Sequence, residues 1–118
     1  MVRRGLLSFF AALALGACQH APSATPAVLQ DKGADTMTAV RAALAQSMDR
    51  ATIELGAGDP TVTPSVAVLP PKPTTFETQS PAIPTMFDLY MRGDDCFAMR
   101  RGDDAEIALE GVRCRPAV

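Results

Sequence analysis

Four acidic residues, arranged as two adjacent pairs, are the first residues of this 118-residue chain whose spacing suggests chemistry. Asp94-Asp95 and Asp103-Asp104 each end a copy of the tetrapeptide Arg-Gly-Asp-Asp. Carboxylate oxygens suit Ca²⁺, but calcium takes about six to eight oxygen ligands. If the two copies are successive hairpin turns, the pairs lie at opposite ends of a shared strand, about 20 Å apart. One cation cannot use both pairs, so we interpret them as solvated turn residues and predict no metal site.

Residues for nucleophilic catalysis are largely missing from the chain. His20 is the single histidine and lies in a segment rich in Ala and Pro, so a Ser-His-Asp or Cys-His arrangement is not predicted. The chain has no Gly-x-Ser-x-Gly elbow and no zinc-binding motif. Glu106 and Glu110 could in principle serve as a glycosidase pair, but a small domain with few aromatic residues offers little cleft for a sugar. We therefore expect neither catalysis nor a cofactor.

The first residues of the chain have the character of an export signal. Arg3 and Arg4 form a positive n-region, and the apolar run from Gly5 to Leu15 has the length of an h-region. A membrane-spanning helix needs about 20 apolar residues, so this run is too short for a transmembrane anchor. Cleavage at small residues followed by simple secretion is an alternative.

The end of this stretch, Leu15-Gly16-Ala17-Cys18, resembles the lipobox of bacterial lipoproteins, and the resemblance covers only these residues. It implies that residues 1–17 are a signal peptide that is removed and that Cys18 is acylated. Two or three acyl chains would hold the protein permanently at a membrane, since one chain alone binds only marginally. In such lipoproteins an Asp directly after the acylated Cys commonly retains the protein in the inner membrane. This chain has Gln19 there, which favours a location at the periplasmic face of the outer membrane.

The composition of the remaining chain limits its partners and its redox state. Cys18 to Val118 has nine basic and thirteen acidic residues, a formal charge of −4, and no Lys/Arg cluster, which argues against nucleic acid as a partner. With Cys18 acylated, Cys96 and Cys114 are left as a pair in a compartment where disulfides persist. We predict a disulfide between them, with the chain bending back near Gly111, that contributes about 3 kcal/mol.

The chain after Cys18 divides into a tether and one domain. Residues 18–34 contain prolines and small residues without an apolar period, so we predict a flexible tether. Residues 35–118 form the domain, with a proline-rich connector at 60–84. A helix is predicted from Thr36 to Met48, with Asp35 as its N-cap. Its core-facing stripe has the spacing of one helix face and consists of Met37, Val40, Leu44 and Met48.

Two strand predictions flank the beginning of the connector. Residues 51–55 alternate between apolar and polar types, which indicates a half-buried strand, although the helix could instead continue to Gly56. Residues 65–69, SVAVL, are the one full strand expected in the proline-rich segment. Residues 70–73 favour an extended polyproline conformation.

The last third of the chain predicts a three-stranded meander. Gly93-Asp94 and Gly102-Asp103 suit the centres of two-residue hairpin loops. Both loops independently place one apolar set on the same face, consisting of Leu89, Met91, Cys96, Ala98, Ile107 and Leu109. A slip of one residue would reverse the faces. The predicted fold is therefore α+β, with one N-terminal helix packed on a small, mostly antiparallel sheet of four or five strands that ends in the meander.

The same register gathers Tyr90, Phe97 and Met99 on the opposite face. A single helix covers one face, so this cluster is either covered by the connector around Val66, Val68 and Phe76, or exposed as a surface for a protein partner. We expect a non-catalytic, lipid-anchored envelope protein that acts as an interaction or structural subunit. A periplasmic ligand-binding or inhibitor module, and an enzyme of unrecognised type, are the alternatives.

Overall fold

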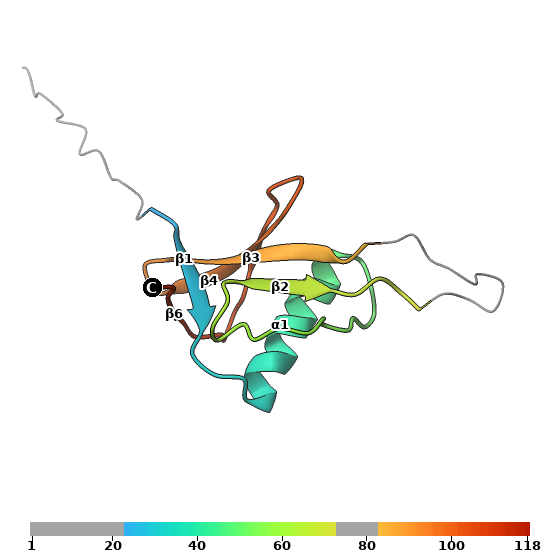
Figure 1. Cartoon of the computed structure of the whole chain (residues 1–118), viewed down its shortest axis with the longest axis horizontal. Helices are drawn as coiled ribbons and strands as arrows, with labels where there is room; N and C mark the ends of the chain where they lie inside the picture. The colour runs from blue at the N-terminus through green and yellow to red at the C-terminus, as the bar shows by residue number, and fades with distance from the viewer. Residues whose placement is uncertain (1–22, 73–82) are drawn as a thin grey trace, which may run out of the picture.

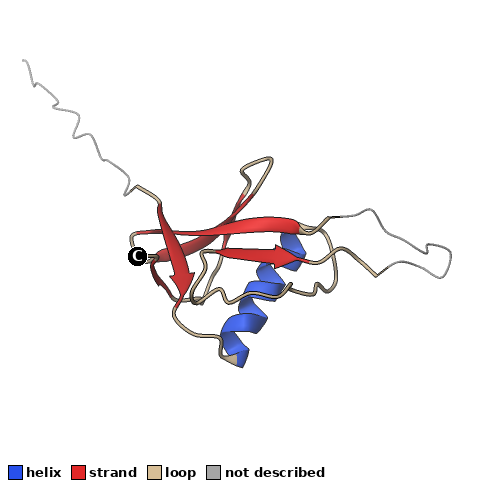
Figure 2. Cartoon of the chain, in the orientation of Figure 1, coloured by secondary structure: helices blue, strands red, loops and turns tan. Residues whose placement is uncertain are grey.

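The computed structural model describes residues 23–72 and 83–118, which form one helix and a six-stranded antiparallel sheet (Figure 1). The prediction of an α+β fold is confirmed, with six strands in place of the four or five expected. The elements in chain order are β1 (Thr25–Leu29), α1 (Ala34–Ser47), β2 (Ser65–Val68), β3 (Thr85–Arg92), β4 (Asp95–Arg100), β5 (Glu106–Ala108) and β6 (Cys114–Pro116). Figure 2 shows α1 crossing one side of the sheet, and none of the described residues forms a helix on the other side.

The meander has the predicted register. β3 pairs with β4 so that Leu89 faces Ala98, and β4 pairs with β5 so that Ala98 faces Ile107. Gly93 takes the left-handed conformation, with φ 61°, at the tight turn between β3 and β4. The second connection is wider than expected, because the last ladder bond runs from the Arg100 N–H to the Ala105 carbonyl. It is a four-residue loop over residues 101–104 and leaves the register unchanged.

The core lies between α1 and the inner face of the sheet, which is the side of the sheet that α1 covers. Phe87 and Leu89 of β3 are buried there against Val40 and Leu44 of α1. Met37 and Met48, the ends of the predicted helix stripe, are partly buried against the same cluster. The apolar period of the helix and the alternation of the strands therefore meet in one core, as expected from their patterns.

β1 and β6 form a part of the sheet that the sequence analysis missed. β1 pairs with β3 at Thr25 and Pro26, and its second half pairs with β6. Its last residues, Ala27, Val28 and Leu29, are buried. The prediction of a flexible tether over residues 18–34 is therefore wrong from residue 25 onward. Pro26 is tolerated in this strand because its carbonyl accepts a hydrogen bond from Ala117 (2.9 Å) and no donor is required of it.

The start of α1 differs from the predicted cap. Gly33 occupies the N-cap position and Asp35 lies inside the first turn, where no side-chain cap bond forms. The Asp31 carboxylate instead accepts hydrogen bonds from the Gly33 N–H (2.7 Å) and the Thr36 hydroxyl (2.9 Å). These bonds, with the Gly33 N–H foremost, lower the pKa of Asp31.

Within the described residues, no helix is long and apolar enough to span a bilayer.

Residues 51–55 do not form the predicted strand, and the helix does not continue to Gly56 either. Leu55 makes a single bridge to Val68, while Ile53 is buried in the core without strand pairing. β2, by contrast, forms where the SVAVL segment predicts it and pairs with β3. β2 pairs with β3 along one edge. Residues 54–56 lie along its other edge, so they cover the edge of a strand without forming a strand themselves.

The predicted disulfide between Cys96 and Cys114 is confirmed, with 5.8 Å between their Cα atoms. It links β4 to β6 across 18 residues of sequence. Gly111, in the left-handed conformation with φ 74°, makes the bend that returns the chain toward β4. By restricting the unfolded chain, a crosslink over a loop of this length contributes about 3 kcal/mol.

Candidate functional site

The outer face of the sheet, defined as the side away from α1, carries the candidate partner residues. Alternation along β3, β4 and β5 places the following side chains there: Met86, Asp88, Tyr90, Arg92, Phe97, Met99, Arg101, Glu106 and Ala108. Tyr90 faces Phe97 across the ladder, and Met99 lies between Asp88 and Glu106. The structure therefore brings Tyr90, Phe97 and Met99 together, in the predicted arrangement.

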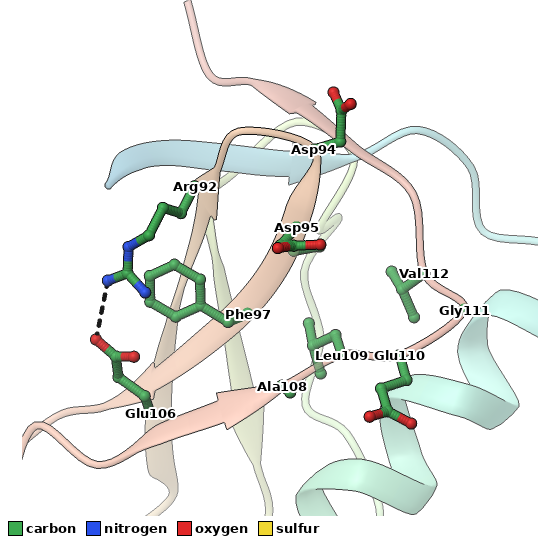
Figure 3. Close-up of a pocket in the computed structure, with 11 residues that line it drawn as sticks. Arg92, Asp94, Asp95, Phe97, Glu106, Ala108, Leu109, Glu110, Gly111 and Val112 are labelled. Atoms are coloured by element: carbon green, nitrogen blue, oxygen red, sulfur yellow. Dashed lines mark hydrogen bonds and ion pairs between the residues drawn. The ribbon is translucent and has the colours of Figure 1, made fainter. Parts of the chain in front are cut away.

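Phe97 is the buried centre of this face, with 6% of its surface exposed. The Tyr90 ring stacks beside it, with 5.8 Å between the ring centroids and 21° between the planes. The Arg92 guanidinium lies over the Phe97 ring, 4.8 Å from its centroid (Figure 3). A cation over an aromatic face is attracted by the negative charge of the π system. Phe97 is thus covered by its own neighbours, while Tyr90 and Met99 stay half-buried.

Two ion pairs border the apolar residues of the outer face. Arg101 donates to both carboxylate oxygens of Asp88, with a closest distance of 2.7 Å, and this carboxylate raises the pKa of Arg101. Arg92 pairs with Glu106 at 3.2 Å. Each pair is partly exposed, so it contributes little to stability. Its structural effect is to hold charged groups beside the apolar centre.

The predicted cover over the outer face is wrong for Val66 and Val68. Val66 and Val68 point into the core beneath the sheet, together with Phe87, because β2 joins the sheet beside β3 and does not lie over it. Phe76, the third residue of the expected cover, lies outside the described residues. The covering that the structure does show on the outer face comes from Tyr90 and Arg92.

The acidic pairs lie at opposite ends of β4, as the meander predicts. Asp94 and Asp95 are at the turn after β3, whereas Asp103 and Asp104 are in the loop before β5. Asp103 pairs with Arg100 at 3.3 Å. Across residues 23–72 and 83–118, no three His, Cys, Asp or Glu side chains are grouped so that they could hold a metal ion.

Open grooves flank β5 on its two sides. One, of about 570 Å³, lies beside Phe97 and is lined by Asp94, Asp95, Glu106 and Glu110 among others (Figure 3). The second, of about 700 Å³, is lined by residues of both β5 and α1. A smaller hollow of about 200 Å³ contains Lys32 and Arg41. Sequence reasoning missed these grooves because they depend on how α1 and β5 are placed in space.

Two other candidate residues from the sequence, Cys18 and His20, lie outside the described residues. Comparison of the chain with models of protein families, with curated proteins and with solved structures gives no match.

The burial of Phe97 leads to a stability prediction. Replacing Phe97→Ala removes a ring enclosed by Tyr90 and Arg92, and we expect the unfolding free energy to fall by about 3 kcal/mol. The matched control, Met99→Ala on the same strand and face, removes a half-buried side chain and should cost about 1 kcal/mol. Urea denaturation of the full-length chain measures both changes. Equal, small losses in the two variants would contradict the enclosed position of Phe97.

Proposed function

We propose that this chain is a lipid-anchored envelope protein that binds another protein without catalysing a reaction, and that the outer face of the sheet is its contact surface. The observation that carries the proposal is the composition of that face: half-buried Met86, Tyr90 and Met99 around an aromatic centre, bordered by arginine–carboxylate pairs. Aromatic residues, Met and Arg are the types enriched at the centres of protein interfaces.

The N-terminal sequence supports the membrane part of the proposal. The lipobox-like Leu15-Gly16-Ala17-Cys18 would attach the chain through Cys18, and the periplasmic face of the outer membrane is the proposed location. β1 begins at Thr25, seven residues after Cys18. Seven residues span at most about 25 Å when fully extended, so the domain would stay close to the membrane. The Cys96–Cys114 disulfide is typical of such an oxidising compartment.

The shape of the surface favours protein binding over the capture of a small ligand. Sites for small molecules are usually concave and enclose about 300 to 1,000 Å³. The hollow with Lys32 and Arg41 is smaller, at about 200 Å³, while the two larger grooves are open troughs along β5. An open face with bordering grooves suits a macromolecule, so the ligand-binding alternative receives less support from this geometry.

The first test concerns the anchor. Changing Cys18→Ala removes the thiol that the acyl chain would occupy, so metabolic labelling with a fatty-acid analogue should be lost and the unprocessed chain should accumulate. The adjacent variant Gln19→Ala keeps the thiol and should label like the wild type. Equal labelling of the wild type and Cys18→Ala would show that Cys18 carries no lipid.

The second test concerns the outer face. A photoreactive amino acid placed at Met99 should give a crosslinked adduct of one defined size in intact cells, because Met99 would lie against the partner. The same amino acid at Thr38, an exposed residue of α1 on the other side of the sheet, serves as the control and should not give that adduct. Identical adducts from both positions, or none from Met99, would contradict the proposed contact surface.

A further inference from the structure

The edge strands of the sheet differ in whether their outward backbone groups are covered. The edge at β6 is protected. Arg113, Arg115 and Ala117 turn their backbone groups toward β1, so Cys114 and Pro116 face outward. The Cys114 carbonyl accepts a hydrogen bond from the Gln30 side chain (3.0 Å). Pro116 has no N–H to offer. A proline on an outer strand is a common means of preventing another strand from pairing there.

The outer edge of β2 is also covered. The Gly56 N–H donates to the Ala67 carbonyl (2.8 Å), and the Leu69 N–H donates to the Glu54 carbonyl (2.8 Å). Residues 54–56 therefore cover the outer edge at the end of β2 and bond the Ala67 carbonyl and the Leu69 N–H. This explains why the segment lies along β2 without forming a strand of its own.

The outer edge of β5 has no such protection among the residues the structure describes. Hydrogen bonds from Leu109 to Cys96 (3.0 Å) and from Arg100 to Ala105 (2.9 Å) show that the odd-numbered residues bond toward β4. In an antiparallel pair the alternate residues face the other way, so Glu106 and Ala108 direct their N–H and C=O groups outward. The Glu106 side chain is held on the outer face by Arg92 and does not cross the edge.

The surroundings of this edge leave space for an added strand. A groove of about 700 Å³ lies beside β5 and α1, and the helix lines it with Ala39, Ala42 and Ala43 and, at its end, with Gln46 and Ser47. Neighbouring strands in a sheet lie about 4.8 Å apart. A strand beside β5 would therefore follow this groove and form four backbone hydrogen bonds, from the two donors and two acceptors of Glu106 and Ala108.

The charge around β5 identifies the kind of strand that fits. Glu106 and Glu110 line both grooves, and Asp94 and Asp95 line the groove on the outer face. Among the residues that the structure describes, Arg92 is the one cation that lines either groove, and it is paired with Glu106. A second copy of this acidic chain would bring like charges together across the edge, whereas a basic segment would be attracted.

We infer that β5 is a docking edge for an extended, basic segment of a partner protein, which adds to the sheet as a strand beside Glu106–Ala108. Side chains alternate along such a segment. Those next to Glu106 and Ala108 lie on the outer side, where lysine or arginine meets the carboxylates. The side chain next to Ile107 lies on the inner side, where a small apolar residue packs on the alanines of α1. This edge is distinct from the outer-face contact at Met99, so the two sites can be tested separately.

The test uses the full-length chain, purified in a nonionic detergent, and a capped hexapeptide of alternating Lys and Val as the probe. Titration followed by NMR should shift the backbone amides of Glu106 and Ala108. Ala108→Pro removes an outward N–H and leaves the bonds to β4 in place, so the dissociation constant should rise about tenfold, as for the loss of one good hydrogen bond. Thr38→Ala, a change at an exposed residue of α1 outside the groove, should bind like the wild type.

A second variant tests the charge without touching the backbone. Glu110→Gln removes one exposed carboxylate and should weaken the Lys-Val peptide about threefold. The matched peptide with Glu in place of Lys should not bind. Unchanged affinity in both Ala108→Pro and Glu110→Gln, or equal binding of the Glu peptide, would overturn the inference. NMR shifts confined to Tyr90 and Met99 would also overturn it, because the peptide would then bind at the outer face. Self-association that Ala108→Pro abolishes would overturn it too, because the occupant of the edge would then be a second copy of the chain.

Discussion

The antiparallel pairing of β3 with β4 is the constraint on which the rest of the structure depends. Because side chains alternate along a strand, placing Leu89 opposite Ala98 puts Phe87 and Leu89 under α1 and leaves Tyr90 and Phe97 on the outer face. A slip by one residue would exchange these two sets. The Cys96–Cys114 disulfide and the β4–β5 ladder are both built on β4 and agree with this register.

Two properties of a small sheet account for the surfaces available for binding. The helix covers one face, so the apolar side chains on the other face must be covered by their own neighbours. The packing of Tyr90 and Arg92 on Phe97 covers part of that face. A sheet that is not closed has edges, and among residues 23–72 and 83–118 the edges of β2 and β6 are protected while that of β5 is not. The outer face and the β5 edge are therefore the two surfaces that we propose for partner binding, since neither requires the core to rearrange.

The sequence predicted the local parts of the fold and missed the non-local ones. The meander was predictable because two Gly-Asp turns and the alternation of Leu89 and Ala98 agree on one register. β1 and β6 were missed because each is short, contains a proline and is stabilised by a strand more than 80 residues away in sequence. The predicted strand near Leu55 was wrong because alternation of apolar and polar residues indicates which side chains are buried, but does not show that the backbone pairs with a neighbouring strand. The Tyr90–Phe97 contact followed from the register, but the Arg92 position, the groove along α1 and the open edge of β5 depend on three-dimensional placement.

The central claim is the register that assigns the two faces and leaves β5 with an open edge, and hydrogen exchange of single backbone amides tests it most directly. In the full-length chain, the amides of Ile107 and Leu109 bond toward β4 and should exchange slowly. Those of Glu106 and Ala108 face outward and should exchange at the rate of unprotected amides. The reverse alternation, or uniform protection along Glu106 to Leu109, would contradict the register or the open edge.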